Sequence, residues 1–272
     1  MMKTPEPKSW IEAQALQGAQ QWDDSLTTFY PETAKWMSDP QAYLERLTKE
    51  CNYLNAAKKI DWDGLLVNQS TVVDLGCGGG WLTAFLSRNE KVARIIAIDS
   101  SSNYLKNFLP GVIALSAGDP LKVEAIQGMF TPLLLPSDCV DTVVMSSAIH
   151  HADSPQAVLE EILRVLKPSG SLVLLNECPV GNLRFLARSA KAHARIFLTT
   201  LQRKYTRHTQ RLSTGAFLYD PYLGDVDYPM WYWEKAIASA GLTLKQIIDT
   251  GMPTVVGSQG RSLQHFICRK PG

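Results

Sequence analysis

The sequence has few cysteines and none of the spacings that build disulfide frameworks or zinc sites. It contains five cysteines in 272 residues, an odd number, and no two of them form a C-x-x-C pair. Wide spacing of this kind argues against a disulfide scaffold and against a structural zinc site. We therefore expect reduced thiols, mostly buried as small apolar side chains.

Long apolar runs are also missing. No stretch approaches the roughly 18 uninterrupted apolar residues of a spanning helix, and residues 1–8 lack the apolar region of a signal peptide. We therefore expect a cytoplasmic protein with no transmembrane segment. With 45% apolar side chains, a chain of this length can bury one large core.

Acidic residues are missing from one long segment. Residues 178–219 contain eight Lys or Arg and no Asp or Glu, which leaves 19 basic and 26 acidic residues in the remainder. Apolar residues within 183–211 recur every three or four positions between these cations, which predicts an amphipathic basic helix or helix pair. An anionic or lipid-like acceptor would suit this segment, and a solvated basic face is the alternative.

A segment rich in aromatic residues overlaps the end of this basic segment and continues beyond it. Seven of the seventeen residues in 217–233 are Phe, Tyr or Trp. Such density suggests a pocket wall for a ring or a lipid tail, and an ordinary hydrophobic core is the other reading.

The rest of the chain alternates between strand and helix patterns. We predict strands at 71–75, 94–99, 123–128, 140–146, 171–177, 242–249 and 263–269, with helices such as 155–166 and 230–240 between them. This order predicts an α/β fold with a Rossmann-like, seven-stranded, doubly wound sheet, mostly parallel with an antiparallel last strand. The predicted parts are an N-terminal helical segment (1–66), a cofactor-binding core (67–178), an inserted cap (179–229) and the end of the sheet (230–272).

A glycine-rich loop follows the first predicted strand, in the run Asp74-Leu75-Gly76-Cys77-Gly78-Gly79-Gly80. Glycines let the backbone approach a ligand closely. A dinucleotide-binding loop would need a third glycine where Trp81 stands. Asp74 would also oppose a pyrophosphate but suits a cation, so a cationic ligand is expected.

These residues resemble the first motif of class I S-adenosylmethionine-dependent methyltransferases. The likeness continues through residues 98–101, 123–128, 134–141, 147–151 and 163–170, a pattern typical of the small-molecule group called methyltransferase type 11. It covers about 110 residues, from 71 to 178, and it implies a Rossmann-like fold with S-adenosylmethionine as cofactor.

The resemblance also implies roles for single residues. The backbone of Gly76, Cys77 and Gly78 would cradle the methionine moiety, with Asp74 near its ammonium group. Asp99 would accept hydrogen bonds from both ribose hydroxyls, and a helix cap is its alternative role. The remaining expected cofactor contacts are Ser100, Ser146, Met129 and Phe130. Met129 stands where the family usually has an aspartate for the adenine amino group, so adenine would depend on backbone groups and packing.

Candidates for the chemistry lie at the carboxyl ends of two predicted strands. His150 and His151 suit proton removal from a hydroxyl or amine, with a structural or cofactor-supporting role as the alternative. Glu177 ends the fifth predicted strand and would orient the acceptor, unless it is a solvated strand end. No metal is implied, because the stretch after the fourth predicted strand lacks clustered carboxylates.

These expectations together predict an enzyme that moves a methyl group to an oxygen or nitrogen of a small organic acceptor. Two alternatives remain open from the sequence. The basic segment would suit a nucleic-acid methyltransferase, although no matching catalytic motif is present. A cofactor-binding partner subunit without catalysis would show the same glycine loop.

Overall fold

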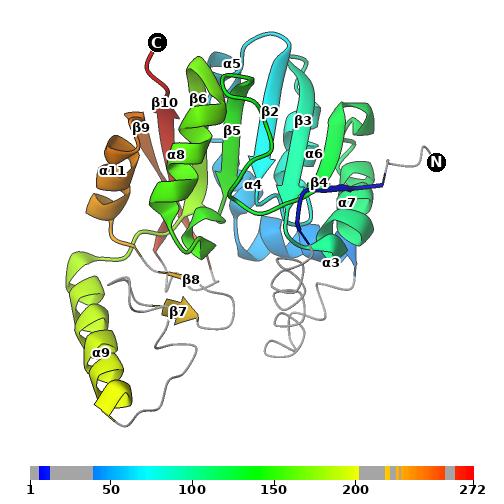
Figure 1. Ribbon diagram of the computed structural model, residues 1–272. Helices are drawn as coiled ribbons and strands as arrows, with labels where there is room; N and C mark the ends of the chain where they lie inside the picture. The colour runs from blue at the N-terminus through cyan, green and yellow to red at the C-terminus, as the bar shows by residue number, and fades with distance from the viewer. Residues whose placement is uncertain (1–5, 13–38, 202–217, 221–224, 227, 255–260) are drawn as a thin grey trace.

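The computed structural model describes residues 6–12, 39–201, 218–220, 225–226, 228–254 and 261–272 (Figure 1). The strands are β1 (Lys8–Ser9), β2 (Ser70–Leu75), β3 (Val92–Asp99), β4 (Val123–Gln127), β5 (Val140–Ser146), β6 (Leu166–Glu177), β7 (Leu218–Asp220), β8 (Asp225–Val226), β9 (Thr243–Pro253) and β10 (Ser262–Arg269). The α-helices are α3 (Pro40–Glu45), α4 (Tyr53–Ala57), α5 (Trp62–Leu65), α6 (Trp81–Ser87), α7 (Leu109–Leu115), α8 (Pro155–Val165), α9 (Asn182–Leu201) and α11 (Met230–Ser239). Single turns of π-helix (Arg46–Glu50, Tyr104–Phe108) and 3-10 helix (Pro120–Lys122, Ile149–His151) complete them.

The main sheet has the order β1-β4-β3-β2-β5-β6-β10-β9. Every strand pair is parallel except those of β10, which runs antiparallel to both β6 and β9. The predicted doubly wound sheet with an antiparallel last strand is therefore confirmed. The predicted count of seven was one too low in the described chain, because β1 adds an eighth strand.

The extra strand lies in a stretch predicted to be helical. Lys8 and Ser9 pair in parallel with Ile126 and Gln127 at the free edge of β4. Two residues are too short for apolar periodicity to show, and their pairing depends on a partner more than a hundred residues away. The helical prediction for residues 1–66 is wrong at this point, and it is confirmed at α3, α4 and α5. Predicted helix within residues 13–38 lies outside the described residues.

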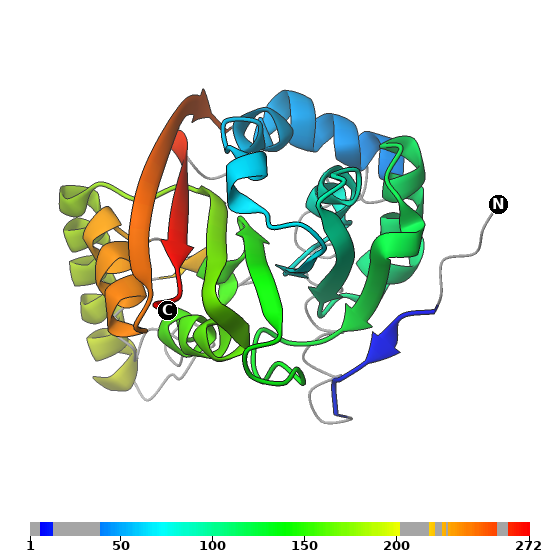
Figure 2. The same cartoon turned by 90° about the horizontal axis from the view of Figure 1, so that it is seen from above.

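Helices cover both faces of the sheet (Figure 2), and an apolar core lies between each layer of helices and the sheet. Alternate residues of β2 point to opposite faces, so Val72 belongs to the core under α3 to α7, and Val73 to the core under α8 and α11. Helices on both faces are what a parallel sheet requires to bury its strands.

Helix boundaries follow local signals. The Ser154 hydroxyl accepts a hydrogen bond from the Ala157 amide at 3.2 Å, so Ser154 caps α8 as predicted. Gly241, with φ of +86°, ends the helix that begins at Met230. Residues 167–170, predicted as a turn, lie within β6, where the pairing register with β5 shifts between Leu166 and Ser171.

The inserted segment is confirmed as a helix in its first half. The helix α9 runs from Asn182 to Leu201, and the short antiparallel pair of β7 and β8 follows it. The predicted helical cations Arg203, Lys204, Arg207 and Arg211 lie outside the described residues. Among the described residues, no helix has both the length and the apolarity to cross a bilayer.

Candidate functional site

The carboxyl ends of β2, β3, β4, β5 and β6 meet at one edge of the sheet, the lower edge in Figure 1. The glycine loop leaves β2 at this edge, and Gly76, Gly78 and Gly80 all have φ between +52° and +84°. A Cβ atom at Gly76 would lie 2.8 Å from Ala148 Cβ and 3.0 Å from Phe130 Cε1. Glycine is therefore required at Gly76 both by its backbone angle and by its close neighbours.

The amide groups of the loop are hydrogen-bonded within the protein. Gly76 and Cys77 donate to the Ile98 carbonyl, Gly78 donates to Asp99 Oδ2 at 2.8 Å, and Gly80 donates to the Cys77 carbonyl. Asp99 Oδ1 also accepts from the Ser101 amide at 2.8 Å. Asp99 therefore joins the glycine loop to the turn after β3. The helix that follows is capped by Ser101, whose hydroxyl accepts from the Tyr104 amide at 3.1 Å, so the helix-cap alternative for Asp99 is wrong, and its ribose contact remains a prediction.

Asp74 lies beneath the loop and is 1% exposed. Its Oδ2 accepts from the Thr83 hydroxyl at 2.6 Å, and within the described chain its Oδ1 is buried without a hydrogen-bond partner. Burial raises the pKa of Asp74 to about 7, the nearby charge of Asp99 adds to this effect, and the Thr83 bond opposes it. A buried carboxylate oxygen without a partner, next to a glycine loop, fits a cationic ligand.

The remaining predicted cofactor residues surround this loop unevenly. Phe130 contacts Gly76, whereas Met129 is 43% exposed at the end of β4. Ser146 ends β5, and because Asp74 pairs with Val144 in the parallel ladder, Ser146 lies level with Gly76. The Ser100 carbonyl accepts a hydrogen bond from the Gln127 side-chain amide at 3.1 Å. Burial raises the pKa of the Cys77 thiol, so this cysteine stays protonated.

A polar cluster lies beside the loop, where β5 and β6 end. His150 Nδ1 is 2.9 Å from Glu177 Oε2, and the His150 and His151 ring centroids are 4.4 Å apart. Glu177 is 2% exposed, so its reading as a solvated strand end is wrong. The Asn176 side-chain Nδ2 donates to the Ser146 hydroxyl at 2.9 Å. Glu177 Oε1 and Asn176 Oδ1 are buried, and neither has a partner within the described residues.

Three residues that contact the glycine loop or the polar cluster were not predicted from the sequence, namely Tyr43, Tyr53 and Asn176. Tyr43, from α3, accepts a hydrogen bond from the Gly79 amide at 3.1 Å, and a Cβ at Gly79 would lie 2.7 Å from Tyr43 Cε1. Tyr53, from α4, donates to the Ser147 hydroxyl at 2.9 Å. Burial raises the pKa of both tyrosines, which therefore stay neutral. The N-terminal helices α3 and α4 thus cover the loop and the polar cluster. The third of these residues, Asn176, lies on β6 within the cluster itself.

Backbone strain marks the same cluster. Ser147 and Asn176 have φ of +49° and +58°, at the carboxyl ends of adjacent strands. Left-handed backbone costs about 1–2 kcal/mol in residues other than glycine and concentrates at functional sites.

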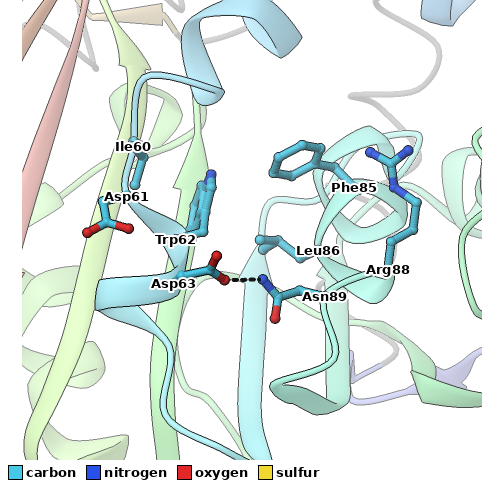
Figure 3. A pocket seen from close by; sticks show the side chains of 8 residues that line it. All are labelled: Ile60, Asp61, Trp62, Asp63, Phe85, Leu86, Arg88 and Asn89. Carbon is cyan, nitrogen blue, oxygen red and sulfur yellow. Dashed lines mark hydrogen bonds between the residues drawn. The ribbon is translucent and has the colours of Figure 1, made fainter.

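A hollow of about 550 Å³ lies between α5 and the end of α6 (Figure 3). Trp62 and Phe85 line it, and an Asn89 side-chain amide donates to Asp63 Oδ1 at 3.2 Å across it. Since α6 runs back along β2, the end of α6 at Phe85 places this hollow at the opposite, amino edge of the sheet. It is therefore separate from the glycine loop. No group of three or more metal-ligating side chains occurs in the part of the chain that the structure describes.

The aromatic segment is divided between core and surface. Tyr228 and Trp233 are buried with ring centroids 5.1 Å apart, in the core under α8. Trp231 is 46% exposed. For Tyr228 and Trp233 the ordinary-core reading therefore holds, while Phe217 and Tyr222 lie outside the described residues.

The fold and the loop define a class of domain, and sequence comparison names it. Residues 73–174 match the sequence model of a family described as "Methyltransferase domain". Residues 73–174 therefore match a methyltransferase domain, and the chain is similar to class I methyltransferases that use S-adenosylmethionine.

Curated relatives match over part of their length. The malonyl-[acyl-carrier protein] O-methyltransferase of Hahella chejuensis is 33% identical over 104 residues, which are 38% of this chain and 34% of that protein. The ubiquinone biosynthesis O-methyltransferase of Xanthomonas oryzae pv. oryzae is 28% identical over 150 residues, which are 54% of this chain and 58% of that protein. The matches thus span between about a third and three fifths of these relatives.

Solved structures extend the likeness to the fold. A chain of the complex between the Haloferax volcanii Trm112 methyltransferase activator and a methyltransferase superposes with a TM-score of 0.57. It is 17% identical, and the match covers 88% of this chain and 97% of that chain. At this identity the likeness shows the fold alone.

Proposed function

We propose that the chain transfers a methyl group from S-adenosylmethionine to an oxygen or nitrogen of a small organic acceptor. The observation that carries the proposal is the contact of the partly buried His150 with the buried Glu177, at the same sheet edge as the glycine loop. Relatives named as O-methyltransferases support the transfer to oxygen.

The proposed cofactor site uses acidic residues from the ends of two strands, β2 and β3. Asp74 offers a buried carboxylate oxygen to the ammonium group, and Asp99 offers both oxygens to the ribose. Each Asp99 oxygen has a second lone pair besides the one that holds a backbone amide. When bound, S-adenosylmethionine supplies an electrophilic methyl group on a positively charged sulfur.

The His150 ring supplies the base in this proposal. A carboxylate only accepts hydrogen bonds, so Nδ1–H of His150 donates to Glu177, and in this tautomer Nε2 carries the basic lone pair. Nε2 would take the proton from the acceptor hydroxyl or amine as that oxygen or nitrogen bonds to the methyl carbon. The bond between the methyl carbon and sulfur would break in the same step, with S-adenosylhomocysteine as the leaving group. Glu177 then stabilises the imidazolium, while its own Oε1 and Asn176 Oδ1 offer acceptors that orient the substrate.

The test is methyl transfer over a panel of small acceptors by the wild type, His150→Gln and Glu177→Gln. We expect kcat to fall about 100-fold or more in His150→Gln, the range of a general base, with cofactor affinity within twofold of wild type. Cofactor binding without turnover on any small acceptor would contradict the proposal and identify a partner subunit. Turnover on nucleic acid alone would contradict the acceptor class.

A further inference from the structure

The helix α9 carries a large apolar surface that faces solvent. Leu183, Leu186, Phe197 and Leu198 are 86%, 61%, 64% and 55% exposed. At 100° per residue these four side chains fall within an arc of about 120°, together with the exposed alanines at 187, 190 and 194. We call these seven residues the apolar stripe.

A row of cations follows one side of the apolar stripe. Arg184, Arg188 and Lys191 are spaced four and three residues apart, which places them on one line along the helix, and the sequence continues the same spacing with Arg195. Residues 182–201 contain no Asp or Glu. The helix therefore presents an apolar face bordered by positive charge along its length of about 30 Å.

The helix is attached to the rest of the protein near its amino end. Phe185 packs edge-to-face on Trp231 with ring centroids 5.9 Å apart, and the Val180 amide donates to the Tyr228 carbonyl at 3.0 Å. Beyond this anchor, no helix or strand among the described residues packs along α9, which projects from the body in Figure 1. The apolar stripe faces away from Phe185 on the helix.

The charge pattern selects the partner. A nucleic acid would engage the cations and leave Leu183, Leu186 and Phe197 in water. A second copy would place two rows of like charges near one another, which is unfavourable. A bilayer with anionic lipid buries the apolar stripe among acyl chains and neutralises the cations with headgroups.

We infer that α9 docks the protein on the surface of a bilayer that contains anionic lipid. The helix lies in the plane of the interface, with the apolar stripe buried about 5–10 Å deep. Because only four residues separate the end of β6 at Glu177 from the start of α9 at Asn182, docking brings the carboxyl edge of the sheet toward the bilayer. If methyl transfer is as proposed, the acceptor is then an amphiphile drawn from the bilayer, a step that rests on the proposed function.

The test is sedimentation of the full chain with vesicles, in the absence of cofactor and acceptor. Vesicles are made of phosphatidylcholine alone or with 30% phosphatidylglycerol. We expect at least tenfold more bound protein on the anionic vesicles at 50 mM salt, and a severalfold loss at 300 mM salt, where the Debye length is shorter.

Variants separate the two features of the helix. The double variant Leu186→Glu/Phe197→Glu and the triple variant Arg184→Glu/Lys191→Glu/Arg195→Glu should each lose at least 90% of this binding. Leu121→Glu is the matched control, since Leu121 is 80% exposed but lies outside α9, and it should bind like wild type. Melting temperature and cofactor affinity should be unchanged in all of them.

Wild-type protein that stays in the supernatant with anionic vesicles at 50 mM salt would overturn the inference. So would vesicle binding that survives Leu186→Glu/Phe197→Glu. A dimer that Phe197→Glu dissociates, seen by light scattering without vesicles, would show that a second copy covers the apolar stripe. Because binding is read without turnover, loss of activity with intact vesicle binding contradicts only the proposed function.

Discussion

At the scale of single residues, Asp74 combines burial with an unused oxygen. Burial raises its pKa to about 7, against about 3.9 for an unperturbed aspartate. The folded protein therefore binds this proton more tightly than the unfolded chain does. The stability that this preference contributes is present below about pH 4 and is lost as the pH rises through about 7.

We expect this titration to appear in cofactor binding. If S-adenosylmethionine binds only the ionised form, the competent fraction rises from about one tenth at pH 6 to about nine tenths at pH 8. The dissociation constant should therefore fall roughly tenfold over this range, measured by titration calorimetry. Asp74→Asn removes the titrating group, and a wild-type profile that parallels the Asp74→Asn profile would contradict the assignment.

Asp99 gives a second residue-scale prediction. Asp99→Ala removes a charge-assisted contact to the ribose, so we expect cofactor affinity to fall by about 1.5–3 kcal/mol. Asp119→Ala is a suitable control, because Asp119 also accepts a backbone amide, that of Leu121, but lies away from the loop. Equal cofactor affinity in Asp99→Ala and Asp119→Ala would show that Asp99 only caps its turn.

At the scale of elements, α3 acts as a cover for the glycine loop. Asp39 fixes its start by accepting from the Gln41 and Ala42 amides, and Pro40 occupies the first turn. The helix then presents Tyr43 to Gly79, with the Tyr43 ring packed on Tyr104 and Phe108 at centroid distances of 6.0 and 5.7 Å. Position and chemistry of the loop thus depend on an element that precedes it by about thirty residues.

Tyr43→Phe tests this dependence. The variant keeps the ring packing but leaves the buried Gly79 amide without its acceptor, which costs about 1–3 kcal/mol. We expect a lower free energy of unfolding in urea and weaker cofactor binding. Unchanged stability and affinity would show that the hydroxyl contact is dispensable and that α3 covers the loop by packing alone.

Elements with regular patterns were predictable, and long-range contacts were not. Strand β5 has its predicted bounds, Val140–Ser146, because a β-branched run ends at a clear boundary. Helix α8 ends one residue before its predicted end. In contrast, β1 exists only because the edge of β4 is free to pair, and nothing within two residues signals that.

The residues of the candidate site likewise include some that local sequence patterns predict and some that they do not. Asp74 and the glycines were predictable because their spacing along the chain is itself the signal. The contact between His150 and Glu177 was not, since it joins side chains from two strand ends 27 residues apart. A Tyr at position 43 has no local mark of function, because its partner Gly79 is reached only after α3 packs on the sheet.

At the scale of the whole molecule, the N-terminal segment closes the edge of the sheet beside the expected adenine site. Lys8 forms an ion pair with Glu124 on β4 at 2.6 Å, and Arg94 on β3 pairs with the same carboxylate. These contacts lower the pKa of Glu124. They are partly exposed and contribute little to stability, so the backbone pairing of β1 determines its position.

Trp10 provides the last prediction. Its amide donates to the Gln127 carbonyl at 2.8 Å, and a Cβ at Gly128 would lie 3.5 Å from Trp10 Cε3. Gly128 precedes Met129 and Phe130, where adenine recognition is expected to depend on packing because no aspartate is present. We therefore expect the Trp10 ring to line the site at the end where adenine would bind. Trp10→Ala should weaken S-adenosylmethionine binding about three- to tenfold, which corresponds to about 0.7–1.4 kcal/mol.

The control for Trp10 is a variant that changes β1 without removing the ring. Lys8→Ala breaks the ion pair with Glu124 and leaves Trp10 in place, so its cofactor affinity should equal that of wild type. Adenosine alone should show the same loss in Trp10→Ala, because the contact is expected at the base. If Trp10→Ala lowers the melting temperature but leaves both affinities unchanged, then β1 only covers the edge of β4 and takes no part in binding.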